Sequence, residues 1–237
     1  MEEIHEIVNE LKNAKIVSII GKVGTGKTTL ATNIIKDFIT DTEVKRNVAI
    51  YSFESFSVSF ISLISQMKKK NLNVFMNKTD FDKNKEIEEE TNTGFFYLYD
   101  GVGMPIDKVK SEINKLSEEI KKYGKKLDAI VVDYLQLTYP LNLPVDTNFE
   151  EVAEENIKKV KELAEHYNIP IILVTMLSNN DKKRDKQKEI IKENSDIVIE
   201  LEKQENNSQI GITNLKNKAE IINCKFDKNS CEFIEVK

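Results

Sequence analysis

Cysteine and long apolar runs are scarce in this chain of 237 residues, and their scarcity excludes several classes of protein. The two cysteines, Cys224 and Cys231, lack the paired spacing of a metal site or a disulfide framework, so we expect reduced thiols. No apolar run approaches the roughly 20 residues needed to cross a bilayer, and no N-terminal signal segment is recognisable. The sequence therefore predicts a cytoplasmic protein without a membrane partner.

Arginine is scarce as well, and positive charge is not in excess. Arg46 and Arg184 are the only arginines among 35 basic residues, so lysine can stand where related proteins carry arginine. Acidic residues number 40, which gives a net charge of −5. A chain with this balance does not attract polyanions over its whole surface. Any contact with nucleic acid must come from a local basic patch.

Short, continuous apolar runs alternate with helical patterns along most of the chain. Such runs, bounded by polar turns, are typical of strands buried on both faces of a parallel sheet. They occupy residues 16–20, 47–54, 94–101, 127–137 and 169–177. Stripes at helical spacing predict helices after the first glycine turn as far as about residue 38, and at 56–67, 109–120 and 149–167. The alternation predicts an α/β fold with helices on both faces of a mostly parallel central sheet.

Two further regions depart from this alternation. Residues 68–94 are charged and weakly patterned, which indicates a helix or loop on the surface. Four apolar runs within 196–237 follow one another closely, as antiparallel C-terminal strands do. With no repeat and no linker, we expect one domain over residues 14–237, preceded by an amphipathic helix within residues 1–13.

The glycine turn after the first apolar run reads GKVGTGKT and matches the phosphate-loop pattern G-x-x-x-x-G-K-[ST]. Glycines allow backbone N–H groups to converge on phosphate oxygens, and the N-terminus of the following helix points at the same anion. Lysine at this position reaches the outer phosphates, and the first threonine hydroxyl reaches Mg²⁺. We therefore predict that ATP is bound by Gly21, Gly24, Thr25, Gly26, Lys27, Thr28 and Thr29.

A second oxygen ligand for Mg²⁺ is expected at the end of the fourth apolar run. Asp133 follows three apolar residues, which places its carboxylate at the C-terminal end of a buried strand. A strand-end aspartate can equally cap a helix or lie in a solvated turn. Beside a phosphate loop, we favour Thr28 and Asp133 as the residues that hold Mg²⁺, Asp133 either directly or through water.

The order of these motifs resembles a known family. The stretches "YSFES", "FYLYDGVGMPIDKVKSEI" and "IVVDYLQL", which follow the phosphate loop in that order, are similar to the RecA-like motor domain of bacterial replicative helicases of the DnaB type. The likeness runs from about residue 14 to the C-terminus. It implies a RecA-like P-loop NTPase fold, ATP hydrolysis, a homo-oligomeric ring that is hexameric in the family, and a role on single-stranded DNA in replication.

The resemblance also implies catalytic roles. Lys27 contacts the transferred phosphate, and Glu54 corresponds to the glutamate that activates the attacking water, although it can also cap the helix that follows. Lys216 and Lys218 correspond to a strand-borne Lys-x-Arg that reaches the nucleotide of a neighbouring subunit. The alternative is a pair of exposed strand lysines.

The sequence departs from the family at three points. Met176 stands where relatives usually have a glutamine that senses the γ-phosphate, and Thr175 is the nearest polar substitute. Lysine replaces arginine at residue 218, which weakens the expected stabilisation of the transition state. Fifteen residues precede the apolar run that leads into the phosphate loop, so we expect the N-terminal collar domain of the family to be missing. A protein partner that replaces the collar is one expectation, and helix 1–13 either docks on a neighbour or packs on its own domain.

Two loops in the family face the DNA channel. The first, after residue 137, contains no Lys or Arg before the next helix. The second, after residue 177, is a predicted DNA-binding loop that contains Lys182, Lys183, Arg184, Lys186 and Lys188, although a solvated charged loop is the alternative. Two functions therefore stay open: a ring-forming ATPase motor on single-stranded DNA, and a non-translocating regulator, loader or assembly scaffold. A small-molecule kinase fits poorly, because no arginine-rich lid is present.

Overall fold

The computed structural model describes most of the predicted domain. The described residues are 14–40, 46–53, 65, 73–76, 95–100, 104–133, 141, 144, 147, 149–203, 209–214, 222–227 and 232–236. The predicted helix within 1–13 lies outside these ranges, as do the predicted helix at 56–67 except for residue 65, and Glu54, Lys216 and Lys218. In the described part of the chain no helix is long and apolar enough to cross a membrane.

All described strands belong to one sheet in the order β10-β9-β8-β7-β1-β6-β5-β2-β4-β3. The strands from β3 to β7 in this order run parallel, and β8, β9 and β10 add antiparallel pairs beside β7. In chain order the strands are β1 (Ile16–Gly21), β2 (Val48–Ser52), β3 (Asn73–Met76), β4 (Phe95–Asp100), β5 (Ala129–Asp133), β6 (Ile171–Met176), β7 (Ile197–Lys203), β8 (Gln209–Asn214), β9 (Ile222–Asp227) and β10 (Glu232–Glu235). The predicted parallel core and antiparallel end are both confirmed.

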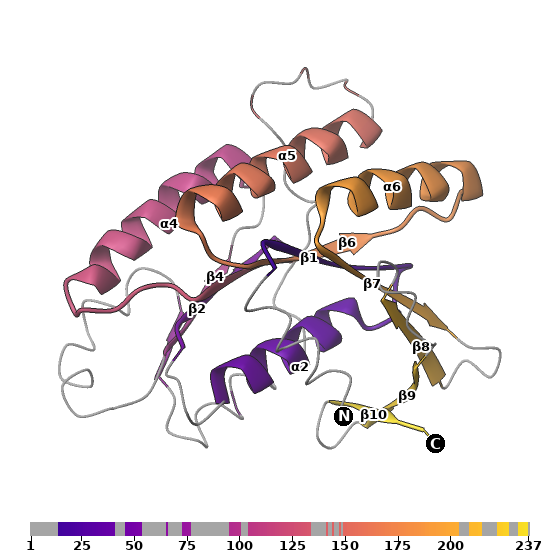
Figure 1. Ribbon diagram of the computed structural model, residues 1–237, viewed down its shortest axis with the longest axis horizontal. Helices are drawn as coiled ribbons and strands as arrows, with labels where there is room; N and C mark the ends of the chain where they lie inside the picture. The colour runs from indigo at the N-terminus through magenta and orange to yellow at the C-terminus, as the bar shows by residue number, and fades with distance from the viewer. Residues whose placement is uncertain are drawn as a thin grey trace.

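Helices cover both faces of the sheet, as Figure 1 shows. One face carries α4 (Ile106–Lys121), α5 (Phe149–Tyr167) and α6 (Asp181–Asn194), and the other carries α2 (Lys27–Thr40). Strand residues alternate between the two layers, since Ile172 packs in the cluster with Leu30 of α2 while Leu173 packs in the cluster with Val160 of α5. We call these two sides the α2 face and the α4–α5 face.

The ends of two helices illustrate how local sequence sets their limits. Helix α5 has the predicted bounds, and Asn168 directly after it adopts a positive φ of 53°, a conformation that Asn tolerates at a helix end. Near the end of α2, the buried Arg46 guanidinium donates to the Phe38 carbonyl at 2.8 Å. The same group lies 4.2 Å above the centre of the Phe38 ring. Arg46 thus provides the hydrogen-bond donor for a backbone carbonyl near the C-terminal end of α2.

The structure corrects three details of the sequence prediction. The segment 68–94 contains β3, a strand at the sheet edge, because the run NVFM is apolar within charged surroundings. Strand β7 pairs with β1 in parallel as well as with β8, since α6 provides a crossover long enough to return the chain in the same direction. The basic segment predicted as a loop is α6, whose N-cap Asn180 accepts from the Lys183 backbone N–H at 3.2 Å.

Candidate nucleotide site

The predicted phosphate loop connects the C-terminal end of β1 to the N-terminus of α2. Gly24 and Gly26 have positive φ angles of 72° and 90°, so glycine is needed for the loop to turn. Helix α2 begins with the Leu30 N–H bonded to the Gly26 carbonyl at 2.9 Å. The first backbone N–H groups of α2 therefore point into the loop, where the helix dipole favours an anion.

Side chains of the loop fold back on its own backbone. Both the Thr25 hydroxyl and the Lys27 ammonium donate to the Lys22 carbonyl, at 2.9 and 2.8 Å. Lys27 is almost fully buried, so its charge is held close over the loop and out of solvent. A fixed ammonium beside converging N–H groups is the arrangement that binds phosphate oxygens.

The loop is also held by the strands on either side of β1. The Gly21 carbonyl accepts a hydrogen bond from the Leu177 N–H at 3.0 Å, just past the end of β6. A Cβ atom at Gly21 would lie 2.7 Å from the Leu201 carbonyl oxygen of β7 and 2.7 Å from the Thr25 hydroxyl oxygen. Any side chain at this position would therefore push the loop away from the sheet, which accounts for the first glycine of the motif.

Thr28 and Asp133 come together as predicted for a magnesium site. The Thr28 hydroxyl lies 3.1 and 3.3 Å from the two carboxylate oxygens of Asp133, and Asp133 is only 2% exposed. Hydroxyl and carboxylate oxygens are the donors that Mg²⁺ prefers, so this pair fits the ion. No cluster of three or more His, Cys, Asp or Glu that could hold a metal exists among the described residues. An ion bound here would take its other ligands from nucleotide phosphates and water, as Mg²⁺ commonly does.

Strand register places Ser52 of β2 beside Asp133 of β5. The backbone N–H of Phe53 donates to the Asp133 carbonyl at 2.6 Å, so β2 and β5 stay together to their C-terminal ends. Ser52 is buried, and strand alternation directs it and Asp133 to the α2 face. The predicted base Glu54 follows this strand end but lies outside the described residues.

The two residues at the end of β6 point to opposite sides. Ile172 and Val174 pack on the α2 face, so alternation sends Met176 to that face and Thr175 to the α4–α5 face. The Thr175 hydroxyl is buried and has no hydrogen-bond partner among the described residues. Met176 therefore has the position on the phosphate side, and Thr175 does not replace a glutamine there.

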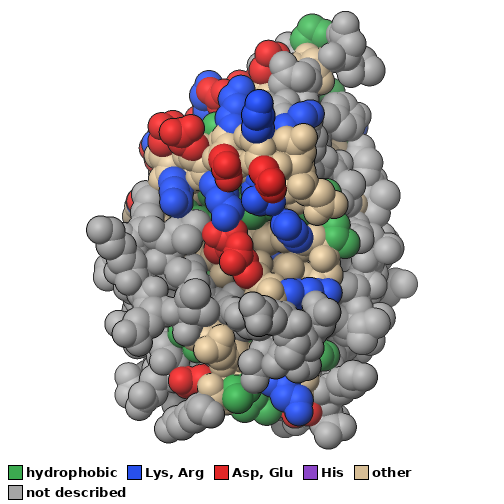
Figure 2. Space-filling model, turned by 90° about the vertical axis from the view of Figure 1, so that its right-hand side faces the viewer, with side chains coloured by type: hydrophobic (Ala, Val, Ile, Leu, Met, Phe, Trp, Pro, Cys, Tyr) green, Lys and Arg blue, Asp and Glu red, His purple; other side chains and the backbone are tan. Residues whose placement is uncertain are grey.

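Helix α6 divides the five basic residues predicted to bind DNA. Lys182, Lys183 and Lys186 are exposed, whereas Arg184 and Lys188, one turn apart, are half-buried. Lys188 forms an ion pair with Glu200 of β7, and Arg184 lies 2.7 Å from Asp181. Figure 2 views the molecule from the side where α6 begins. On this face, Lys and Arg side chains are interspersed with Asp and Glu side chains. The patch is mixed in charge rather than uniformly basic.

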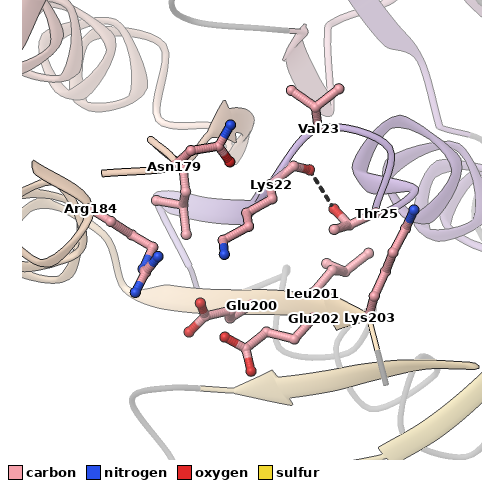
Figure 3. Close-up of a pocket in the computed structure, with 10 residues that line it drawn as sticks. Lys22, Val23, Thr25, Asn179, Arg184, Glu200, Leu201, Glu202 and Lys203 are labelled. Atoms are coloured by element: carbon pink, nitrogen blue, oxygen red, sulfur yellow. Dashed lines mark hydrogen bonds between the residues drawn. The ribbon is translucent and has the colours of Figure 1, made fainter. Parts of the chain in front are cut away.

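A pocket of about 460 Å³ adjoins the phosphate loop between α6 and β7 (Figure 3). Its cationic side chains are Lys22, Arg184 and Lys203, and its carboxylates are Glu200 and Glu202. Glu200 is only 6% exposed, although its neighbours in β7 are apolar. Sequence reasoning missed this pocket; the signal was the acidic residue Glu200 within the apolar run of β7.

The fold and site together define a P-loop NTPase of the RecA-like class. The model of the family described as DnaB-like helicase C terminal domain matches residues 1–231. The chain is 24% identical over 266 residues to a probable replicative DNA helicase of Trieres chinensis, covering 98% of this chain and 56% of that protein. It is 22% identical over 240 residues to the replicative DNA helicase DnaB of Mycoplasma pneumoniae, covering 90% and 48%.

A solved structure of a DnaB-like replicative helicase, described with its interactions with primase, has the same fold with a TM-score of 0.65. It is 16% identical, and the match covers 97% of this chain and 61% of that one. This chain belongs to the DnaB-like helicase C-terminal domain family. It spans about half the length of the curated relatives that it matches.

Proposed function

We propose that this domain binds and hydrolyses MgATP and that, as a ring of identical subunits, it drives movement along single-stranded DNA in replication. The observation that carries the proposal is the contact between Thr28 and the buried Asp133 beside the phosphate loop. This contact brings an Mg²⁺ donor pair to the place where the loop would hold the β- and γ-phosphates. Membership of a helicase domain family supports the motor function.

Within this proposal each part of the site has a task. The loop N–H groups and Lys27 hold the phosphates, and bound Mg²⁺ supplies charge neutralisation when the nucleotide is present. Thr28 and Asp133 hold the ion, and Glu54 accepts the proton of the attacking water. The flanking pocket is lined by cations (Lys22, Arg184 and Lys203) and by carboxylates (Glu200 and Glu202), so it suits a ligand that has both phosphate oxygens and hydrogen-bond donors.

Binding of MgATP is the first test. We expect millimolar MgATP to raise the melting temperature, because a ligand that binds only the folded state stabilises it. An ATPase assay with and without single-stranded DNA then separates a motor from a simple nucleotide binder. An unchanged melting temperature, or the absence of turnover, would contradict the proposal.

Lys216 and Lys218 are proposed to act on the neighbour's nucleotide. Because they are two residues apart, the predicted strand would point both the same way and bring positive charge to the open side of the γ-phosphate. We expect turnover per chain to rise with protein concentration. Mixing Lys218→Ala with Glu54→Gln chains should restore some activity, because some interfaces then contain both intact halves. A rate per chain that is constant, with no recovery on mixing, would assign the lysines to the surface.

The proposed DNA contact concerns the exposed side of α6. Replacing Lys182, Lys183 and Lys186 by Gln should reduce the salt dependence of single-strand binding by about 2 in log–log slope, because each lost phosphate contact accounts for about 0.7. A matched control replaces three exposed lysines of α4, namely Lys108, Lys110 and Lys121, which lie on another helix of the same layer. Equal effects of the two triple variants would contradict a DNA path along α6.

A non-translocating regulator, loader or scaffold is the second candidate, and Met176 is the observation that favours it. Its thioether lies on the phosphate side of β6 and cannot hydrogen-bond a phosphate or a water usefully. Turnover that is unaffected by single-stranded DNA would support this candidate. Replacement of Met176 by Gln should then introduce stimulation by DNA.

A further inference from the structure

The C-terminal strand β10 lies against α2, on the side of the molecule opposite to α4 and α5 (Figure 1). Its residue Phe233 is 1% exposed and belongs to the same core cluster as Leu30 and Ile34 of α2. The ring of Phe226 in β9 packs against it at a centroid distance of 6.0 Å. Phe233 is thus a fixed part of the core and not a mobile tail residue.

The Phe233 ring fills the space beside Gly26 of the phosphate loop. A Cβ atom built on Gly26 would lie 2.6 Å from Cζ of Phe233, and 3.4 and 3.6 Å from its two Cε atoms. The tip of the ring therefore rests on the one glycine whose carbonyl starts α2 and whose φ is 90°. Since glycine has no side chain of its own to hold it, its conformation depends on what packs against its backbone.

Two polar contacts hold β10 along the same side of α2. The Phe233 backbone N–H donates to the Asn33 side-chain oxygen at 3.1 Å, and Glu232 forms an ion pair with Lys36. Asn33 comes seven residues after Gly26, which is about two helical turns, and Lys36 comes one turn later. Gly26, directly before α2, therefore lies on the same side of the helix as Asn33 and Lys36, and β10 contacts all three residues.

We propose that Phe233 is a positioning residue for nucleotide binding, which fixes the Gly26 backbone so that the phosphate loop keeps its anion-binding shape. The inference rests on the proposed ATP binding. Phe233 is buried behind the loop, so its effect on the nucleotide passes through Gly26. Loss of the ring would free Gly26 to turn its N–H away from the phosphates, and an atom added at the ring tip would push the loop forward.

Two substitutions of Phe233 test this inference in the full chain. Phe233→Leu keeps an apolar side chain but withdraws it from Gly26. Phe233→Tyr adds one oxygen at Cζ, the atom nearest to Gly26, and retains the rest of the ring. We expect each to raise the dissociation constant of MgATP about tenfold or more, since each removes or distorts a shape that every loop hydrogen bond needs.

The control is Phe226→Leu, which makes the same chemical change in the adjoining but more exposed ring of β9. Titration with a fluorescent ATP analogue gives the affinity, and urea unfolding gives the stability of each variant. We expect Phe226→Leu to lower stability while its nucleotide affinity stays within about twofold of the unaltered chain.

The possible outcomes are distinct. Unaltered affinity in folded Phe233→Tyr, or equal affinity losses in Phe226→Leu and Phe233→Leu, would overturn the positioning role and leave Phe233 an ordinary core residue. If Phe233→Leu does not fold, Phe233→Tyr and its comparison with the unaltered chain decide the question. Failure of the unaltered chain to bind MgATP would instead refute the proposed function, and with it the reason for positioning the loop.

Discussion

The two faces of the sheet differ in the hydrogen bonding of their buried polar groups. On the α2 face such groups have partners: Thr28 contacts Asp133, Asn33 accepts from Phe233, and Thr32 donates to the Thr29 carbonyl at 2.7 Å. On the α4–α5 face, the Ser18 and Ser195 hydroxyls bond each other at 2.7 Å, but the hydroxyls of Tyr51 and Thr175 are buried without a hydrogen-bond partner among the described residues. Unsatisfied buried hydroxyls cost stability, whereas a satisfied network fixes geometry.

The polar contacts on the surface of the α4–α5 layer also differ from those of the α2 face. Its polar contacts are largely ion pairs on helix surfaces, such as Lys115 with Glu112 and Lys122 with Glu119. Exposed pairs of this kind contribute little. The comparison indicates that the α2 face holds the chemistry and that the α4–α5 face supplies a hydrophobic support. Substitutions on the first face should change ligand binding and turnover, whereas those in α4, in α5 and in the strand residues packed beneath these two helices should change stability alone.

The largest effect is expected at Lys27. Lys27→Ala removes the ammonium charge that the Lys22 carbonyl holds over the loop, so MgATP should no longer raise the melting temperature. Lys159→Ala on α5 is the control, since it removes a lysine that pairs with Asp107 in the other layer. If Lys27→Ala keeps a normal thermal shift with MgATP, the loop does not bind phosphate as proposed.

Asp133→Asn should have the second-largest effect on the function of the site. The amide keeps the shape of the side chain and can still contact the Thr28 hydroxyl, but it loses the charge that holds Mg²⁺. We expect turnover to fall by about 100-fold or more while nucleotide affinity falls much less, because the ion acts mainly in the transition state. Steady-state ATPase rates over a range of Mg²⁺ measure this. Full turnover in the variant would show that another residue, and not Asp133, holds the metal.

Tyr51→Phe should increase stability. Burial, reinforced by nearby Tyr97 and Glu112, raises the pKa of Tyr51 well above its usual range, so its hydroxyl is neutral at all ordinary pH values. Removal of a buried hydroxyl that lacks a partner should raise the free energy of unfolding by about 1 kcal/mol. Urea unfolding at pH 7 checks the value, and nucleotide affinity should not change. A loss of stability would reveal a partner for this hydroxyl.

The smallest expected effect is on the pH dependence of stability, and it concerns Asp107 in α4. Partial burial favours a higher pKa, but the Leu141 N–H at 2.7 Å and the Lys159 ammonium outweigh it, and the pKa of Asp107 is lowered. A carboxyl group with a lowered pKa in the folded state stabilises the protein above its unfolded pKa and loses this contribution as the pH falls.

Asp107→Asn should therefore reduce the acid sensitivity of unfolding. Urea midpoints at pH 7 and pH 3 should differ slightly less in the variant than in the unaltered chain, and ATP turnover at pH 7 should be unchanged. Asp181→Asn is a matched control, because Asp181 also pairs with a cation but is largely exposed. An identical pH dependence in all three proteins would contradict the assignment.

Local patterns in the sequence determined the elements that carry strong periodicity. The apolar run before GKVGTGKT, the strand end at Asp133 and the helix over 149–167 were all predictable, because each depends on neighbours within about ten residues. The same patterns predicted a loop over 181–192, where the structure has α6. The charged residues of α6 conceal a narrow buried stripe of Gln187 and Ile191, which the turn-rich start at Asn179 and Asn180 further obscured.

Tertiary structure alone decided how distant segments complete the site. The parallel pairing of β7 with β1 brings Glu200 and Leu201 to the phosphate loop, and nothing near those residues in sequence predicts it. The division of the α6 lysines between solvent and β7 likewise depends on the ion pair of Lys188 with Glu200. Phe233, at the far end of the chain, meets Gly26 only because β8, β9 and β10 fold back beside α2. The physical reason is that periodicity reports which face of an element is buried, whereas the packing of elements determines what that face touches.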